Sequence, residues 1–395
     1  MNKPYLNETY FAMALDPIHI GTGGYTLGRV DNPIVRDFDG VPKIPGTSIE
    51  GNARTYAYFQ ELGNNKACAL GKKIKDNEKE ILPCGKCQIC FSYGYTRDDR
   101  SLQGMAIFSD ARILFFPVAS LIGPVWVTSS SILDELNICK DKDNWKKLEH
   151  ENDGKEYCVV SEDLGNKLKN VGYLNFGWLL LPLKKKNKEV VTHDIDSMAT
   201  FGNNGFTFEK RNFNQELIFK RLVIVSNSVF GQIVNSNLEV RTSVSIDPET
   251  GAAQERALFT YEAIPRTTVF YFEVVYQNPE HFEISNKVSI DEVISTVEKG
   301  FELFDSLGVG GMGTRGFGKL KIFGLDKKFD PVELAKIQVK NINNKLQKID
   351  EELKSASDEK KAKLENEKES IKNKIRSKAE MLSKLAEIYK AIEGD

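Results

Sequence analysis

Short runs of hydrophobic residues, separated by turns rich in glycine and proline, recur along the chain and indicate strands. Residues 9–15, 107–118, 221–226, 269–276 and 319–323 have the length and the β-branched or aromatic content of strands. Residues 49–62 and 291–307 have helical spacing. The first run follows the hydroxyls of Thr47 and Ser48, which can cap a helix, and the second ends at Gly308. This irregular alternation predicts an α+β fold rather than a doubly wound sheet.

The strongest local signal is a hairpin over residues 238–265. Val240, Thr242, Val244 and Ile246 alternate with other residues ahead of a turn at 247–251, and a second strand-like run returns over 258–263. Such alternation around a glycine-containing turn predicts two antiparallel strands.

The composition changes to helix formers from about Asp330 onwards. Apolar residues with three- and four-residue spacing are Val339, Ile342, Leu346, Ile349, Leu353 and Ala356. After a polar run at 355–360, the spacing resumes from Leu364. We therefore expect a core domain over residues 1–324 and an antiparallel helical hairpin over residues 325–395. The spacing leaves open whether that hairpin packs on its own domain or faces a neighbouring subunit.

Two stretches predict insertions in the core domain. Residues 138–215 contain two polar segments and are expected to form a lid or insertion. Residues 63–104 carry Cys84, Cys87 and Cys90 at the spacing of a zinc knuckle, with Cys68 upstream as a fourth thiolate. A closed four-thiolate site would bind structural Zn²⁺ and hold together a stretch that has no core of its own. The alternative is a group of free thiols.

The charge and the hydropathy of the sequence restrict the class of protein to which this chain can belong. The 395 residues include 54 basic and 56 acidic side chains, so no basic surplus indicates nucleic-acid binding, although a local basic face can hide in the average. No apolar run approaches the roughly 20 residues needed to cross a bilayer, and residues 1–10 lack the pattern of a signal peptide. We therefore expect a cytoplasmic protein without membrane contact.

Three strings near the N-terminus occur in a distinctive order. They are Pro17-Ile18-His19-Ile20-Gly21-Thr22-Gly23, then Val30-Asp31-Asn32-Pro33-Ile34, then Ile44-Pro45-Gly46-Thr47-Ser48-Ile49-Glu50-Gly51. A further string occupies residues 109–118, and a glycine-rich loop spans residues 308–318. Together with the hairpin, these strings strongly resemble the RAMP superfamily over residues 8–324, with gaps.

Within that superfamily, the chain is most similar to the repeated backbone subunit of subtype III-B CRISPR effector complexes, and its cysteine insert also resembles that of subtype III-A. The resemblance implies a ferredoxin-like core, similar to an RNA-recognition motif, which packs along a guide RNA beside further copies of itself and other subunits. It also implies that the hairpin acts as a thumb that displaces one base pair between the guide and a complementary target RNA. A loop aspartate then cuts the target beside each displaced nucleotide.

The resemblance places this aspartate at Asp31. RNA cleavage by its own 2′-hydroxyl needs in-line geometry, a proton acceptor and charge stabilisation at phosphorus, and a displaced nucleotide can reach that geometry. A lone carboxylate in a loop can act as the base or hold one Mg²⁺. The alternative is that Asp31 only caps a turn before Pro33.

Three further residues are candidates for catalysis. His19 could act as an acid, as a donor to phosphate or as a stacking ring, or it could be structural. Tyr261 and Glu262, at the base of the thumb hairpin, correspond to a region where related subunits place residues that support cleavage. Either residue could instead pack or pair across the strands.

Contacts with RNA are expected from the basic residues Arg36, Lys43, Arg54 and Arg315. Gly313, in the glycine-rich loop, would let backbone N–H groups approach the RNA closely. Glu50 stands where the family favours lysine, which removes a phosphate contact that Arg54, one turn later, would replace.

Two other functions remain open from the sequence. A scaffold that holds guide RNA without cutting would leave both assembly and cleavage unchanged when Asp31 is replaced by alanine. A guide-processing ribonuclease of the same superfamily would cleave a repeat RNA hairpin as an isolated protein. The second is disfavoured because such relatives tend to duplicate the core and lack a long thumb hairpin.

Overall fold

The computed structural model describes most of the core domain. The described residues are 3–24, 30–61, 65–76, 79–136, 156–186, 189–193, 200–201, 206–207, 215–253, 258–282 and 288–325, together with 350, 361, 365, 368 and 369. The chain divides into two units, Met1–Leu325 and Asp326–Asp395. The predicted helical hairpin over residues 325–395 therefore lies outside the described residues, apart from isolated positions. Among the described helices, none combines the length and the hydropathy needed to span a membrane.

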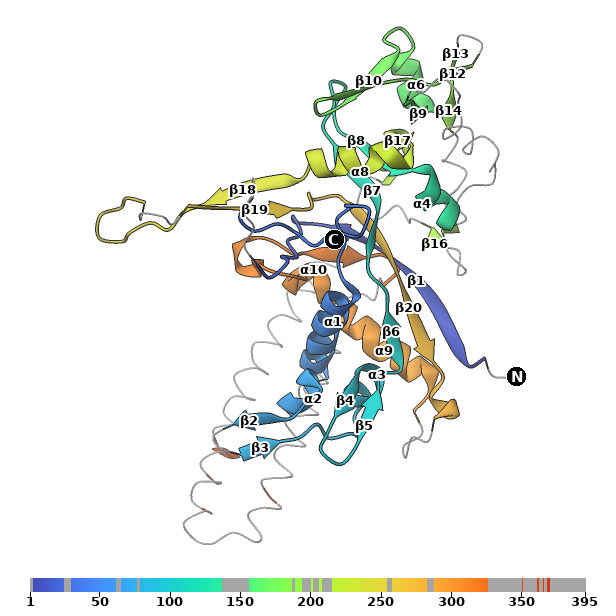
Figure 1. Cartoon of the computed structure of the whole chain (residues 1–395). Helices are drawn as coiled ribbons and strands as arrows, with labels where there is room; N and C mark the ends of the chain where they lie inside the picture. The colour runs from blue at the N-terminus through green and yellow to red at the C-terminus, as the bar shows by residue number, and fades with distance from the viewer. Residues whose placement is uncertain are drawn as a thin grey trace, which may run out of the picture. The chain divides into compact units, whose positions relative to one another are not determined.

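The first unit is built on a four-stranded antiparallel core with two helices (Figure 1). Its elements in chain order are β1 (Tyr5–Ala14), α1 (Gly46–Gln60), β6 (Ala106–Phe108), β7 (Arg112–Val118), β20 (Val269–Gln277), α9 (Ile290–Phe301) and β21 (Leu320–Ile322). The strands lie in the order β7-β20-β1-β21, and β6 also pairs with β20. This is the βαββαβ connectivity of a ferredoxin-like fold, with β6 and β7 together as its second strand. The predicted α+β, ferredoxin-like class is confirmed.

The sheet continues beyond β7 into a second half. Strand β8 (Val125–Ser129) pairs with β7, and β17 (Leu222–Val225), β9 (Cys158–Ser161) and β14 (Thr192–His193) follow in that order. Every residue of β9 is buried. The predicted polar insertion at 138–215 thus supplies a buried strand to the main sheet. The sequence pattern missed it because four apolar or small residues between charged segments are too short to show a period.

Smaller elements complete the described structure. In the cysteine-bearing insert they are α2 (Lys66–Leu70), β2 (Ile74–Asp76), β3 (Lys79–Ile81), α3 (Gln88–Tyr93), β4 (Gly94–Thr96) and β5 (Ser101–Gln103). In the second half they are α4 (Ser130–Glu135), α6 (Glu162–Leu168), β10 (Tyr173–Phe176), β11 (Leu179–Pro182), β12 (Lys185–Lys186), β13 (Glu189–Val190), β15 (Thr200–Phe201), β16 (Phe206–Thr207), α7 (Gln215–Lys220) and α8 (Asn227–Ser236). Two short helical turns, η2 (Pro279–His281) and α10 (Phe304–Leu307), flank α9.

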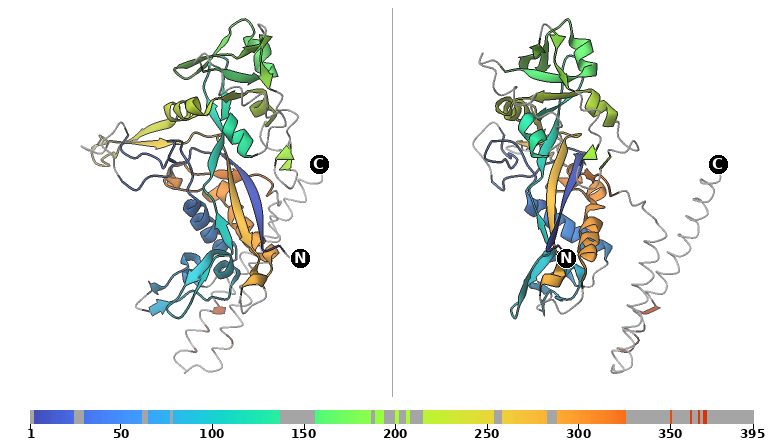
Figure 2. Two further views of the ribbon diagram at one scale, coloured as in Figure 1. Left: turned by 45° about the vertical axis from the view of Figure 1, so that its right-hand side comes forward. Right: turned by 90° about the vertical axis from the view of Figure 1, so that its right-hand side faces the viewer.

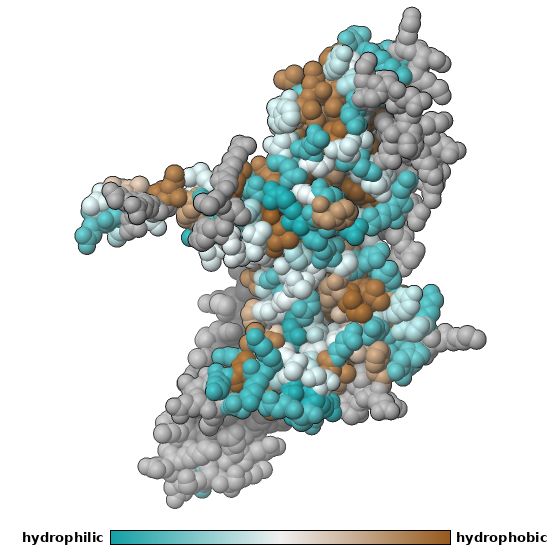
Figure 3. All heavy atoms as spheres, in the orientation of Figure 1, coloured by the Kyte–Doolittle hydropathy of each residue, from teal (hydrophilic) through white to brown (hydrophobic). Residues whose placement is uncertain are grey.

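The predicted hairpin forms as strands β18 (Glu239–Ser243) and β19 (Phe259–Ala263), which pair antiparallel. Figure 1 and the left view of Figure 2 show it projecting from the edge of the unit. It exposes Val240, Val244, Ile246 and Leu258, and Figure 3 shows hydrophobic surface along this arm. Its base, in contrast, lies against the N-terminal loops.

Both faces of the central sheet are buried, so its strands are hydrophobic on consecutive residues. In β1, Ala12 and Ala14 belong to the cluster that includes residues of α1 and α9, whereas Phe11 and Met13 belong to a second cluster. All four are at most 3% exposed. The two clusters hold β1 in the centre of the unit, which fixes where the loop after β1 emerges.

The start of α1 differs from the prediction. Neither Thr47 nor Ser48 caps the helix. The helix begins at Gly46, and the residue before it makes no capping hydrogen bond with its side chain. Instead, the Asp110 carboxylate accepts a hydrogen bond from the Gly46 backbone N–H at 2.8 Å. A Cβ at Gly46 would lie 2.6 Å from the carbonyl oxygen of Phe108, so the helix start packs directly on the second strand. Asp110, which is distant in sequence, therefore caps the N-terminus of α1.

Close packing of α1 on α9 depends on Gly300, because a Cβ there would lie 2.2 Å from the carbonyl oxygen of Ala53. We expect Gly300→Ala to lower the free energy of unfolding by about 1–3 kcal/mol through overpacking. Gly51→Ala is the matched control, since Gly51 is also helical but its added Cβ would meet nothing within 4 Å. That control should stabilise by about 0.5–1 kcal/mol. Urea unfolding of both variants measures these changes. Equal stability of the two variants would contradict the close packing of α1 on α9.

Candidate active site

Strand β19 and the loop at residues 30–36 run side by side at the base of the thumb hairpin. The Asn32 N–H donates to the Thr260 carbonyl at 3.0 Å, and the Glu262 N–H donates to the Asn32 carbonyl at 3.1 Å. Because side chains alternate along a strand, Thr260 and Glu262 face this loop, while Phe259 and Tyr261 face the other way. The thumb base and the loop that holds Asp31 are thus one hydrogen-bonded unit.

Asp31 is fixed by Thr260 through three hydrogen bonds. Its Oδ2 accepts from the Thr260 backbone N–H at 2.7 Å and from the Thr260 hydroxyl at 2.9 Å. The Asp31 N–H in turn donates to the same hydroxyl oxygen at 3.0 Å. The backbone N–H and hydroxyl of Thr260 hold the pKa of Asp31 below its ordinary value. Asp31 is therefore an ionised carboxylate at neutral pH and a weak proton acceptor.

Glu262 holds the far end of the same loop. Its Oε2 accepts from the Arg36 guanidinium at 2.8 Å and from the Ile34 N–H at 3.3 Å. Arg36 also donates to Asn235 at 3.0 Å. The predicted candidates Glu262 and Arg36 therefore both lie in the site. They form an ion pair with each other, so their role in this geometry is structural.

The rings of His19 and Tyr261 lie on the face of β19 that points away from the loop of Asp31. His19 is 6% exposed, and its Nδ1 lies 2.6 Å from the Glu262 carbonyl oxygen. Since a carbonyl can only accept, Nδ1 carries the proton. Tyr261 is 5% exposed and packs edge-on against His19, with ring centroids 6.0 Å apart. These two rings anchor the strand from inside the protein, which supports the structural alternative for His19.

The glycine-rich loop closes the site on the Tyr261 side. The Gly311 N–H donates to the His19 carbonyl at 2.9 Å, and a Cβ at Gly310 would lie 2.6 Å from that carbonyl oxygen. Phe317 packs against Tyr261 with centroids 5.5 Å apart. Gly310, with a φ of 83°, therefore provides both the backbone conformation and the space for this close approach.

The basic candidates differ sharply in exposure. Gly313 and Arg315 form an exposed turn, with the Arg315 guanidinium 5.9 Å from the centre of the Phe259 ring. Lys43 pairs with Asp110 at 2.7 Å and with Asp37 at 3.3 Å, so its charge is already compensated. Arg315 and Gly313 therefore suit a contact with phosphate, and Lys43 suits it poorly.

Arg54 is buried, contrary to the prediction that it contacts phosphate. Its side chain donates to the carbonyls of Cys68, Tyr93 and Gly94 at 2.7–3.2 Å. It also lies 3.7 Å from Glu50 on the preceding turn of α1. Arg54 therefore ties the cysteine insert to the core helix, and it cannot supply the phosphate contact that the carboxylate of Glu50 is unable to make.

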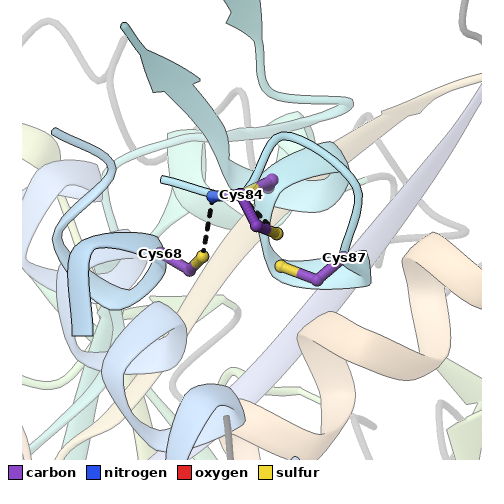
Figure 4. Close-up of side chains that lie close together, drawn as sticks. Cys68, Cys84 and Cys87 are labelled. Atoms are coloured by element: carbon purple, nitrogen blue, oxygen red, sulfur yellow. Dashed lines mark hydrogen bonds between the residues drawn. The ribbon is translucent and has the colours of Figure 1, made fainter. Parts of the chain in front are cut away.

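The four clustered cysteines come together in the insert. Cys68, on α2, and Cys84, Cys87 and Cys90, around the start of α3, have sulfur atoms that all lie within 4.8 Å of one another. In Figure 4 the labelled thiols of Cys68, Cys84 and Cys87 point toward one another. The Cys84 N–H donates to the Cys68 sulfur at 3.2 Å, and the Lys86 N–H to the Cys84 sulfur at 3.4 Å.

Hydrogen bonds from Cys87 and Cys90 lower the pKa of Cys68 to about 4, while the bond to Cys68 raises the pKa of Cys90. A lowered pKa favours the thiolate, which is the form of cysteine that binds metal. Four sulfur donors, with backbone N–H groups directed at two of them, fit the chemistry of a closed tetrahedral zinc site.

Comparison with known proteins gives the family. The model of the RAMP superfamily matches residues 12–321. This chain belongs to the RAMP superfamily. Over 323 residues it is 28% identical to the CRISPR system Cmr endoribonuclease Cmr4 of Pyrococcus furiosus, covering 81% of this chain and 95% of that protein. Over 81 residues it is 36% identical to the CRISPR system Cms endoribonuclease Csm3 of Methanocaldococcus jannaschii, covering 20% of this chain and 29% of that one.

Among solved structures, a chain of the type III-B Cmr-beta complex in its apo state matches this RAMP fold with a TM-score of 0.50 at 14% identity. The match covers 80% of this chain and 96% of that chain. At this identity the likeness concerns the fold alone. It agrees with the α+β fold that the sequence predicts.

Thr260 is the site residue that sequence reasoning did not single out. A threonine in a strand is expected from β propensity alone, so its residue type carried no signal. Its position did carry one, because residues two apart in a strand share a face and Thr260 lies two before Glu262.

The burial of Arg54 yields a prediction on stability. We expect Arg54→Ala to lower the free energy of unfolding by about 2–4 kcal/mol, because three buried carbonyls would be left without their donor. Arg315→Ala, at an exposed position, should change it by less than about 0.5 kcal/mol. Urea unfolding compares the two. If Arg54→Ala were as stable as the unmodified chain and instead bound guide RNA weakly, a phosphate contact would be supported.

Proposed function

We propose that this chain is a backbone subunit of a type III CRISPR effector complex that binds guide RNA and cuts complementary target RNA at regular intervals. The support is its membership of the RAMP superfamily and its similarity over nearly the whole length of a protein named as a Cmr endoribonuclease. Further copies of the chain, other subunits and the two RNA strands are its proposed partners.

We assign cleavage to Asp31, and one observation carries this assignment. The candidates are His19, Asp31, Tyr261 and Glu262. Among them, only Asp31 has a partly exposed carboxylate that no cation neutralises within the described residues. Both hydrogen bonds from Thr260 go to Oδ2, which leaves Oδ1 outside the contact with Thr260. The carboxylate therefore stands ionised and oriented at the base of the hairpin that is proposed to displace a target nucleotide.

The proposed reaction uses the target's own 2′-hydroxyl. Its oxygen bonds to phosphorus, the bond to the 5′-oxygen breaks, and the hydroxyl proton passes to that leaving oxygen through a base. The products are a 2′,3′-cyclic phosphate and a 5′-hydroxyl. Because a low pKa makes Asp31 a weak base, we assign it the binding of a divalent cation such as Mg²⁺.

One carboxylate suits that task, since Mg²⁺ is commonly held by one or two carboxylates together with substrate phosphates. When bound, the ion neutralises negative charge that develops at phosphorus. Arg315 and Gly313, on the exposed turn beside Phe259, are the proposed contacts for the RNA backbone.

Replacement of Asp31 tests the proposed function. In complexes reconstituted with guide RNA and Mg²⁺, Asp31→Ala should slow target cleavage by roughly 100-fold or more without weakening target binding. Asp39→Ala, in an exposed turn of the same loop region, is the matched control and should cut normally. Product ladders and filter binding measure the two quantities. Unchanged cleavage by Asp31→Ala would favour the scaffold function.

We also propose that Cys68, Cys84, Cys87 and Cys90 bind structural Zn²⁺ and that the protein resides in the cytoplasm. The donor set supports the first proposal, and unpaired thiols suit a reducing compartment. The site would have no open position for water, so its task is to hold the insert against α1.

Metal analysis tests the zinc proposal. The purified chain should contain about one zinc ion, and Cys90→Ser should lose most of it and unfold at a lower temperature. Cys158→Ser controls for loss of a buried cysteine, because Cys158 lies in β9 outside the cluster. It should keep its zinc. A full chain without zinc, or equal zinc in Cys90→Ser, would contradict the proposal.

A further inference from the structure

The side chain of Thr260 is tied to Asp31 in a closed pair. Its hydroxyl donates to Asp31 Oδ2 at 2.9 Å and accepts from the Asp31 N–H at 3.0 Å. The Thr260 backbone N–H adds a third bond, to the same Oδ2, at 2.7 Å. Hydrogen bonds to an ionised acceptor are stronger than neutral ones. The rotation of the Asp31 carboxylate is thus set by this threonine.

The position of the loop from Asn32 onward, in contrast, does not depend on the Thr260 side chain. Main-chain bonds join Asn32 to the Thr260 carbonyl and to the Glu262 N–H, and the Glu262 carboxylate holds Ile34 and Arg36. All of these would remain if the hydroxyl were removed. The hydroxyl therefore acts on Asp31 alone, because it holds the Asp31 backbone N–H and one oxygen of the Asp31 carboxylate.

We propose that Thr260 is a positioning residue for RNA cleavage, whose hydroxyl orients the Asp31 carboxylate so that Oδ1 is presented to the target backbone. This inference rests on the proposed role of Asp31. It also explains why Thr260 lies on β19. This strand forms the base of the thumb, and its threonine orients the carboxylate of Asp31. A misdirected carboxylate would bind its cation poorly, even with the RNA correctly held.

Two substitutions separate the hydroxyl from the shape of the side chain. Thr260→Val keeps the β-branched shape and the backbone N–H but removes the hydroxyl, whereas Thr260→Ser keeps the hydroxyl. Thr192→Val is the control, because Thr192 is an exposed threonine of a strand, β14, at the far edge of the main sheet. It makes the same chemical change outside the thumb and outside the loop of Asp31.

The experiment measures single-turnover cleavage and target affinity in the complete reconstituted complex, with Asp31→Ala alongside. We expect Thr260→Val to cut roughly 10- to 100-fold more slowly with unchanged target affinity. Thr260→Ser should restore most of the rate, and Thr192→Val should cut normally. A purely structural threonine would not give this combination of reduced rate, retained affinity and rescue by serine.

Each contrary outcome has a distinct meaning. If Asp31→Ala stops cleavage but Thr260→Val cuts at the normal rate, the positioning role is refuted and the proposed function stands. The positioning role is also refuted if serine is as slow as valine, or if Thr260→Val loses target binding or assembly. If Asp31→Ala itself cuts normally, the proposed function fails, whatever the threonine variants do.

Discussion

The two-residue period of strand β19 is the constraint on which the candidate site depends. Thr260 and Glu262 face the loop of Asp31, and Phe259 and Tyr261 face the glycine-rich loop. A shift of one residue in the pairing of β19 with the loop at Asn32 would exchange the two sets and place aromatic rings against the carboxylate. The register of β19 against this loop therefore determines whether the site exists at all.

This arrangement explains why most charged groups near the site are unavailable for chemistry. Arg36 and Glu262 neutralise each other while they hold the loop, and Lys43 is neutralised by two aspartates. Asp31 is held by uncharged donors instead, so it keeps its negative charge. The protein thus uses ion pairs to build the loop and neutral hydrogen bonds to hold the ionised carboxylate of Asp31.

Much of this could be predicted from the sequence, because the signals were local. The alternating hairpin and the cysteine spacing each lie within a short segment, and the structure shows both the paired strands and the cluster of sulfur atoms. The burial of Arg54 could not be predicted, since it depends on carbonyls 14–40 residues away along the chain. The role of Thr260 depends on a partner 229 residues away, which no local pattern reveals.

The most direct measurement is the position of Asp31 relative to RNA in the assembled complex. A structure with guide RNA, Mg²⁺ and a target carrying a 2′-deoxy nucleotide at the cut site would trap the uncut state. We predict that Asp31 Oδ1 lies within about 4 Å of a scissile phosphate oxygen, the span of one bridging Mg²⁺. A separation of roughly 10 Å or more at every displaced nucleotide, beyond hydrogen-bond or single-ion reach, would contradict the account.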